Sequence, residues 1–179
     1  MISLVAAVGQ NLELGKKGHV IWSFQEDLDF YLSQTRGKKL LVGKKTYDSM
    51  PTFPGKSTLY VLNEFDFDAA AQRTSDWGKE HTFVVTDLPK IIDQYKADDS
   101  GAGQSDELVV IGGAGVYAQT LPYATHLYLC EIKTSDPDAD VFFPAFNPND
   151  YQRTVLGQGT VADGEHKGLA FETVVYTRI

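Results

Sequence analysis

Asp27 is a carboxylate in a place where the surrounding sequence predicts an apolar side chain. Ser23-Phe24-Gln25-Glu26 has the Ser-x-x-Glu form of a capping box, which predicts the start of a helix. Asp27 lies on the predicted inward stripe of that helix, which consists of Phe24, Leu28, Tyr31 and Leu32. An unpaired carboxylate in an apolar wall is costly, and no Lys or Arg stands one helical turn away. The pattern points to a ligand as its partner, although a simple preference of the acid for the positive end of the helix fits the spacing as well.

Three glycines follow a predicted buried strand in the segment 109–117, Val-Val-Ile-Gly-Gly-Ala-Gly-Val-Tyr, and a helix is predicted after them. Glycines at such a turn let the backbone approach a phosphate closely and present free amides at the positive end of a helix. The turn suits the pyrophosphate of a dinucleotide, although a Gly-rich turn can also be only a tight turn. The segment is neither G-x-G-x-x-G nor a Walker loop, which disfavours an ordinary dinucleotide-binding fold and a nucleotide triphosphatase.

A second sequence of strand, glycine and helix start occurs at residues 39–47, with Lys44 and Lys45 at the turn. Two cations and the hydroxyl of Thr46 beside free helix amides suit an additional phosphate, as on the ribose of NADP. Solvated surface lysines are the alternative. Two turns of this kind in one acidic chain support an anionic dinucleotide more strongly than either turn does alone.

The segment from Gln10 to Trp22 joins a predicted buried strand to the capping box, and its polar, glycine-bearing composition predicts a lid. A passive connection is equally consistent with this composition. No histidine has neighbouring ligands at metal spacing, so no metal site is expected. The chain has no G-x-S-x-G nucleophile elbow, and Cys130 lies within a predicted strand, where inert packing is expected.

The composition of the chain bounds its class. A chain of 179 residues, 42% of them hydrophobic, predicts one globular domain over residues 1–179. Its 16 basic and 24 acidic residues give a net charge of −8, which disfavours nucleic acid or an anionic membrane as a partner. The single cysteine excludes an internal disulfide, and we expect neither a secretory leader nor a membrane span, which would need roughly 20 apolar residues. We therefore expect a cytoplasmic protein.

Short apolar runs predict six buried strands with four helices between them. The predicted strands are 2–8, 39–42, 59–62, 82–86, 108–111 and 126–132, and the predicted helices are 26–35, a short one from Thr46, 88–96 and 116–121. This alternation predicts an α/β fold, with helices flanking a central mixed sheet that is mostly parallel. Segments 151–156 and 171–178 predict an antiparallel hairpin at the carboxyl end. Residues 98–106 are polar and glycine-rich, which predicts a surface loop.

These motifs, in register over nearly the whole chain, resemble those of the dihydrofolate reductase family. The resemblance is carried by Met1 to Ala7, Gly15, Trp22, Asp27-Leu28, Thr35, Gly43, Thr46, Ser49, Pro54-Gly55, Ile111-Gly112-Gly113, Tyr117, Leu127-Tyr128-Leu129, Asp140 and Phe143-Pro144. It implies a monomeric reductase that uses NADPH to convert dihydrofolate to tetrahydrofolate, supports one-carbon metabolism and is a target of antifolates.

The resemblance also assigns roles to individual residues. Asp27 would accept two hydrogen bonds from the pterin, and Trp22 would lie near the water path that brings a proton to the adjacent ring nitrogen. Desolvation should raise the pKa of Asp27. The pterin and benzoyl pocket would be lined by Val5, Leu28, Tyr31, Met50, Phe53 and Ile111, for each of which ordinary core packing is the alternative.

For NADPH, the resemblance implies contacts from several backbone segments. Ala7 and Leu14 would hold the nicotinamide amide beside the lid glycine Gly15, and Gly112 and Gly113 would supply a cis peptide next to the cofactor. The phosphate and adenosine end would be held by Lys44, Lys45, Thr46, Ala114, Gly115, Val116 and Tyr117, with Asn63 at a position that often contacts the cofactor phosphate.

Four features depart from the family pattern. Lys56 follows Pro54-Gly55, where an arginine usually grips the carboxylate of the glutamate tail, and a lysine lacks the bidentate fork. Cys130 stands where a threonine hydroxyl usually contacts the acid and the pterin. Ile21 and Phe24-Gln25 replace more usual residues near the lid, and Gly115 with Asn63 leaves more of the phosphate binding to the two lysines.

Two rival functions stay open on the sequence alone. The first is a reductase of the same fold that acts on another pterin or on a pyrimidine of flavin synthesis, which the lysine at position 56 motivates. The second is a noncatalytic module that binds a nucleotide. The presence together of Asp27, Trp22 and the double glycine favours the folate enzyme over both.

Overall fold

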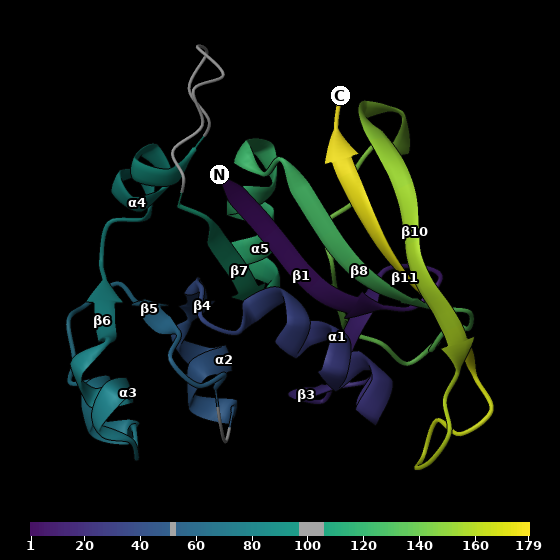
Figure 1. The fold of residues 1–179 in the computed structure, drawn as a ribbon, viewed down its shortest axis with the longest axis horizontal. Helices are drawn as coiled ribbons and strands as arrows, with labels where there is room; N and C mark the ends of the chain where they lie inside the picture. The colour runs from purple at the N-terminus through teal and green to yellow at the C-terminus, as the bar shows by residue number, and fades with distance from the viewer. Residues whose placement is uncertain (51–52, 97–105) are drawn as a thin grey trace. The chain divides into compact units, whose positions relative to one another are not determined.

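The structure is a computed structural model that describes residues 1–50, 53–96 and 106–179 (Figure 1). Contacts group the chain into two compact units. Unit 1 consists of Met1–Leu4 and Thr35–Thr125, and unit 2 consists of Val5–Gln34 and His126–Ile179. Strand β1 (Ile2–Val8) contributes its first residues to unit 1 and its last residues to unit 2. The expectation of one domain over residues 1–179 stays a prediction.

Unit 1 is built on parallel strands. Beside the first residues of β1 it contains β4 (Lys39–Gly43), β5 (Thr58–Leu62), β6 (Thr82–Val85) and β7 (Leu108–Gly112), in the order β1-β7-β4-β5-β6. Its helices are α2 (Lys44–Ser49), α3 (Asp76–Glu80), α4 (Leu88–Tyr95) and α5 (Ala114–Thr120), with 3-10 turns η1 (Ala70–Gln72) and η2 (Leu121–Tyr123). Leu40, Leu41 and Val110 are fully buried, as expected for strands of a parallel sheet that is covered on both faces.

Unit 2 carries the antiparallel part of the fold. It contains β8 (His126–Ile132), β10 (Tyr151–Thr160) and β11 (Ala170–Arg178), in the order β10-β11-β8-β1. A separate three-stranded sheet has the order β3-β2-β9 and consists of β2 (Glu13–Lys16), β3 (His19–Val20) and β9 (Val141–Phe142). Helix α1 (Gln25–Thr35) and the 3-10 turn η3 (Pro148–Asp150) complete the unit, apart from Thr35, which belongs to unit 1.

The predicted fold class is confirmed: the fold is mixed α/β, with a central sheet that is mostly parallel and antiparallel strands at the carboxyl end. Each predicted strand and helix is present within a few residues of its predicted bounds. The predicted hairpin is longer than expected, because β10 continues to Thr160 (Figure 1). Of the predicted loop at 98–106, residues 98–105 lie outside the described part of the chain.

The capping-box prediction for α1 is wrong in its details. The helix begins at Gln25, and the carbonyl of Phe24 accepts the first helical bond from the amide of Leu28 at 3.1 Å. The carboxylate of Glu26 accepts from the backbone amide of Ala162 at 3.0 Å. The predicted inward stripe is also incomplete, because Leu28 is 46% exposed. The first turn of α1 is therefore fastened by a hydrogen bond to a residue distant in sequence.

The segment predicted as a polar lid contains the hairpin of β2 and β3. The signal that was missed is the pair Lys17-Gly18 at its turn, where both residues have positive φ angles of 51° and 78°. A two-residue hairpin turn of this kind requires positive φ at both positions, and glycine adopts it without strain. In the described residues, no helix is long and apolar enough to cross a membrane.

Candidate active site

Asp27 lies on the first turn of α1, in unit 2. The residue as a whole keeps intermediate exposure, but protein atoms surround its carboxyl group, and this burial raises its pKa to about 7. A hydrogen bond from the thiol of Cys130 acts in the opposite direction and lowers the pKa. The expectation that desolvation raises the pKa of this acid is confirmed.

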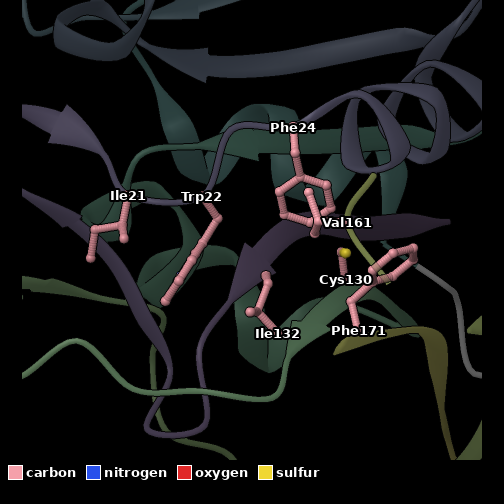
Figure 2. Close-up of a cluster of buried hydrophobic side chains, with 7 residues drawn as sticks. All are labelled: Ile21, Trp22, Phe24, Cys130, Ile132, Val161 and Phe171. Atoms are coloured by element: carbon pink, nitrogen blue, oxygen red, sulfur yellow. The ribbon is translucent and has the colours of Figure 1, made fainter. Parts of the chain in front are cut away.

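Cys130 lies on β8 and is fully buried. Burial raises the pKa of its thiol, and the nearby Asp27 raises it further, so the thiol is neutral at physiological pH and can donate its proton. Figure 2 shows Cys130 within the cluster formed by Ile21, Trp22, Phe24, Ile132, Val161 and Phe171. The thiol thus connects Asp27 to the apolar core of unit 2.

Trp22 is held from two directions within unit 2. Its indole Nε1 donates to the backbone carbonyl of Glu13 at 2.9 Å, and its side chain is 5% exposed. The ring also packs closely against Gly9, where an added Cβ would lie 2.8 Å from its Cζ2 atom. Both contacts restrict the ring, one at the Glu13 carbonyl and one at the backbone of Gly9.

Sequence reasoning missed Glu13, which is a buried carboxylate with 1% exposure. Its Oε1 accepts from the amide of Asn11 at 2.5 Å, and its Oε2 accepts from the amide of Asp136 at 2.6 Å. A buried carboxylate needs such partners, and backbone amides supply them here. No spacing in the sequence signals this role, because the partners are amides and Asp136 is distant in sequence.

His166 was also missed. It lies in the 161–169 turn between β10 and β11, and its Nε2 is 2.7 Å from the backbone carbonyl oxygen of Ile21. Its ring centroid lies 5.4 Å from that of Trp22 and 6.4 Å from that of Phe24. In sequence it was one of four histidines without a motif, so only the folded chain reveals it.

The other residues predicted for unit 2 differ in exposure. Val5 is buried, Tyr31 and Ala7 have intermediate exposure, and Leu28 is exposed. In the β2–β3 hairpin, the carbonyl of Leu14 accepts from the amide of Ile21 at 3.0 Å. An added Cβ at Gly15 would lie 2.8 Å from the carbonyl oxygen of His19, so this hairpin has no room for a side chain there.

Unit 1 brings the two glycine-bearing turns into contact. Gly43 precedes α2 and Gly113 precedes α5. An added Cβ at Gly113 would lie 2.8 Å from Oγ1 of Thr46, and one at Gly43 would lie 3.1 Å from Cγ2 of Val116. The peptide between Gly112 and Gly113 is cis, as the family resemblance implied, and Gly112 has a φ of +131°.

The polar residues around these turns are only partly available to a ligand. Nζ of Lys44 pairs with Asp48 at 2.6 Å, whereas Lys45 is exposed. The side-chain amide of Asn63 donates to the carbonyl of Phe65 at 2.6 Å, which stabilises a local turn. Ala114 and Thr46 have intermediate exposure, an added Cβ at Gly115 would meet open space, and Val116 and Tyr117 are buried.

The remaining residues predicted for the substrate lie in unit 1 and are described within it alone. Ile111 is buried on β7. Phe53 stacks on Tyr47 with ring centroids 5.4 Å apart, and Met50 has intermediate exposure. Lys56 is exposed and has a positive φ of 59°. Within the described ranges, no three His, Cys, Asp or Glu side chains gather as metal ligands.

Comparison with known proteins gives one family. A family model described as dihydrofolate reductase matches residues 1–178. The dihydrofolate reductase of Neisseria meningitidis serogroup A is 29% identical over 179 residues, which cover 99% of this chain and 98% of the relative. Dihydrofolate reductase type 5 of Escherichia coli is 30% identical over 151 residues, which cover 84% of this chain and 85% of the relative.

One solved structure supports the same fold. The dihydrofolate reductase from Enterococcus faecalis complexed with NADP(H) and RAB-propyl has a TM-score of 0.74 and 22% identity, and the match covers 99% of this chain and 96% of that chain. At this identity the likeness concerns the fold.

Proposed function

The chain belongs to the dihydrofolate reductase family, and from that membership we propose which of its residues bind the two reactants and promote the reaction. Its function is the NADPH-dependent reduction of 7,8-dihydrofolate to 5,6,7,8-tetrahydrofolate, which supports one-carbon metabolism. The reaction adds a hydride and a proton across one carbon–nitrogen double bond. The protein must therefore hold a flat heterocycle and deliver a proton to it.

Asp27 is the residue that binds the pterin. The observation that carries this assignment is its buried carboxyl group, whose pKa burial raises to about 7. Near neutral pH such a group occurs in both protonation states, so it can accept hydrogen bonds from the pterin and support protonation of the ring. A carboxylate accepts two parallel hydrogen bonds, from the amino group and a ring nitrogen of the pterin, and these fix the orientation of the ring.

Trp22 orients the proton-delivery side of this site. Its ring is fixed by the hydrogen bond to the carbonyl of Glu13 and belongs to the same cluster as Cys130, which donates to Asp27. In the proposed site, an indole from the cluster that contains Cys130 would limit the access of bulk water to the acid. The thiol of Cys130 lowers the pKa of Asp27, because its hydrogen bond stabilises the ionised form of the acid.

The two glycine turns of unit 1 fit the phosphates of NADPH. An added Cβ at Gly113 would lie 2.8 Å from Oγ1 of Thr46, so a glycine at this position lets the hydroxyl stand beside the amides at the start of α5, where a phosphate would bind. Thr46 and the exposed Lys45 would hold the phosphates, with Lys44, Asn63 and the backbone at Ala114, Gly115 and Val116 beside them and Tyr117 supporting Gly112. Ala7, Leu14 and Gly15 would hold the nicotinamide end. When bound, NADPH supplies the hydride.

Apolar residues contribute the walls for the pterin and benzoyl groups. Leu28 is 46% exposed although it is apolar and lies one turn after Phe24, which suits a side chain that contacts a ligand. We assign the same role to Val5, Tyr31, Met50, Phe53 and Ile111. Lys56 binds the glutamate tail with a single charge, because an ammonium group cannot form the bidentate contact of a guanidinium group.

The decisive experiment follows NADPH oxidation with dihydrofolate as the second substrate. We expect turnover by the wild-type protein and a loss of kcat/KM of about 100-fold or more for Asp27→Asn, because the substituted amide neither accepts both hydrogen bonds nor exchanges a proton. Asp29→Asn is the matched control, since Asp29 is an exposed acid on the same helix. Undiminished turnover by Asp27→Asn, or equal losses in both variants, would contradict the role of Asp27.

The same assay separates the rival substrate classes. A pterin without the glutamate tail and a pyrimidine intermediate of flavin synthesis are offered in place of dihydrofolate. We expect the pyrimidine to support no NADPH oxidation. Preference for it over dihydrofolate would favour the rival reductase.

We also propose that the protein is a cytoplasmic monomer, folds as one domain and needs neither a nucleic acid nor a membrane partner. The net charge of −8 supports the absence of a nucleic-acid or membrane partner, because it opposes binding to polyanions. Sedimentation at increasing concentration tests the monomer. Coincident unfolding transitions from fluorescence and circular dichroism test the single domain, because two independently folding parts would give separate transitions.

A further inference from the structure

The turn between β10 and β11 forms hydrogen bonds with the chain on both sides of Trp22. On the amino-terminal side, Nε2 of His166 lies 2.7 Å from the carbonyl oxygen of Ile21. On the carboxyl-terminal side, the amide of Ala162 donates to the carboxylate of Glu26 at 3.0 Å. The residues between these two points lead from the β2–β3 hairpin into α1, which carries Asp27.

The aromatic ring of His166 adds a second kind of contact. It packs against Trp22 with ring centroids 5.4 Å apart and planes inclined by 52°, and it meets Phe24 edge-on at 6.4 Å and 70°. Trp22 and Phe24 belong to the cluster that surrounds Cys130 (Figure 2). Cys130 in turn donates a hydrogen bond to Asp27. A continuous set of contacts thus runs from His166 to the acid, entirely within unit 2.

The turn itself is braced in a way that fixes His166. The amide of Gly168 donates to the carbonyl of Val161 at 2.9 Å, and the amide of Leu169 donates to the carbonyl of His166 at 3.1 Å. Val161 is buried in the same cluster as Trp22. His166 therefore lies in a short turn that is closed by backbone hydrogen bonds and held in the core by the buried Val161.

We propose that His166 is a positioning residue for the reduction of dihydrofolate: it holds the Ile21 carbonyl and the Trp22 ring so that Trp22 stays in place beside the acid-bearing helix. This inference rests on the roles proposed above for Trp22 and Asp27. His166 acts through Trp22 and does not touch the reactants. The contact uses a donor and a flat ring at once, a combination that few side chains other than histidine supply.

The contact does not require a charged histidine. A backbone carbonyl only accepts, so Nε2 must carry a proton, and both the neutral Nε2–H tautomer and the cation satisfy this condition. The ring also borders an open cavity of about 390 Å³, whose charged and titratable lining is Lys16, Lys17, His19, Asp136 and Glu165. Lys16 pairs with Asp136 at 2.7 Å across that lining. Both charge states of the ring can therefore donate to the Ile21 carbonyl.

Three substitutions separate the two contacts of His166. His166→Phe keeps a ring but removes the donor, His166→Gln keeps a donor but removes the ring, and His166→Ala removes both. Lys167→Ala changes the neighbouring exposed residue of the same turn and serves as the local control. Arg153→Ala is the stability control, because Arg153 on β10 pairs with Glu131 on β8 at 2.5 Å and with Glu172 on β11 at 3.0 Å.

Kinetics and tryptophan fluorescence are measured together, in a Trp77→Phe background that leaves Trp22 as the only indole. We expect His166→Ala to lower kcat about tenfold while the KM values for both substrates change less than about twofold, because misplacement of a fixed group acts on the chemical step. His166→Phe and His166→Gln should each recover part of the loss. The Trp22 emission maximum should move to longer wavelength in His166→Ala, and Lys167→Ala and Arg153→Ala should match the background in both readouts.

Three outcomes would overturn the positioning role. They are wild-type kcat and emission in His166→Ala, a loss of kcat in Arg153→Ala as large as that in His166→Ala, or a failure of both partial variants to recover any activity. The emission shift measures the contact between His166 and Trp22 independently of turnover. If Asp27→Asn stays fully active while the emission shift is present, the proposed role of Asp27 fails and the contact of His166 with Trp22 stands.

Discussion

The thiol of Cys130, on β8, donates a hydrogen bond to the carboxyl group of Asp27, on α1. The thiol itself is kept neutral because burial raises its pKa. Burial raises the pKa of Asp27 to about 7, and the thiol bond limits the rise. The protonation state of the acid near neutral pH is thus set by two opposing effects, one of which depends on a single side chain that can be exchanged.

Exchanging Cys130 should move the pH dependence of the reaction. Cys130→Ala removes the donor that stabilises ionised Asp27, so the midpoint in the pH profile of kcat/KM should rise by about half a unit or more. Cys130→Thr supplies a stronger hydroxyl donor, so the midpoint should move downward. Steady-state rates from pH 5 to 9 measure both shifts. Midpoints that do not move in either variant would show that the thiol bond has no part in the titration.

The buried acid should also make stability depend on pH. The native pKa of Asp27, about 7, lies above its ordinary value of 3.8, so the native state binds more protons than the unfolded state between these values. Asp27 therefore contributes stability at acidic pH, and this contribution is lost as the pH rises toward 7. Asp27→Asn should raise Tm relative to wild type at pH 8.5, with a smaller difference at pH 5.

Thermal unfolding at both pH values measures this effect, and Asp29→Asn is the control because it removes an exposed charge from the same helix. The control should shift Tm equally at the two pH values. A gain for Asp27→Asn that is larger at pH 5 than at pH 8.5 would contradict the sign of the pKa shift.

A side chain at Gly113 should weaken binding of NADPH. Its Cβ would lie 2.8 Å from Oγ1 of Thr46, so the Thr46 hydroxyl must rotate away from the backbone of Gly113. We expect Gly113→Ala to raise the KM for NADPH about tenfold, because the hydroxyl no longer meets the phosphate. The KM for dihydrofolate should change much less.

A double-mutant cycle with Thr46→Ala tests the cause. Thr46→Ala alone should reproduce most of the loss, and adding Gly113→Ala to it should change little. Gly55→Ala is the control, since an added Cβ there meets open space. Fully additive losses would mean that Gly113 acts independently of the hydroxyl.

Lys56→Arg should tighten substrates that carry a glutamate tail. A guanidinium group forms two parallel hydrogen bonds with a carboxylate, whereas the ammonium group of lysine acts as a point charge. The KM for dihydrofolate should fall about threefold to tenfold, with no change for a pterin that lacks the tail. Lys79→Arg, at an exposed lysine of α3, is the control. An equal effect on both substrates would place Lys56 away from the tail.

The fold was predictable where hydrophobic patterning decides the structure. The buried strands at 2–8 and 126–132 were predicted with their observed bounds, because continuous apolar runs between turns leave little alternative. The three-stranded sheet was missed because β3 and β9 have two residues each, which are too few to show a strand pattern. Such short strands depend on their partners, which the sequence does not reveal.

The site was predictable where one residue contradicts its local pattern. Asp27 stood out because it is an acid among apolar residues, and the raised pKa agrees with that interpretation. Leu28 was placed on the inward stripe by helical spacing and is exposed, because periodicity cannot tell a core-facing side chain from one at an open surface. Glu13 and His166 could not be found, since each binds a backbone group far away in sequence.

The contacts of Glu13 limit which segments can be exchanged between relatives. Its two carboxylate oxygens accept hydrogen bonds from the amides of Asn11 and Asp136. One side chain therefore links the stretch around Asn11 to the stretch around Asp136. A chimaera that imports residues 9–22 alone would bring that carboxylate to a foreign 133–137 loop, and its second oxygen would lose the amide it fits. Transplantation of this segment therefore has to carry both stretches together.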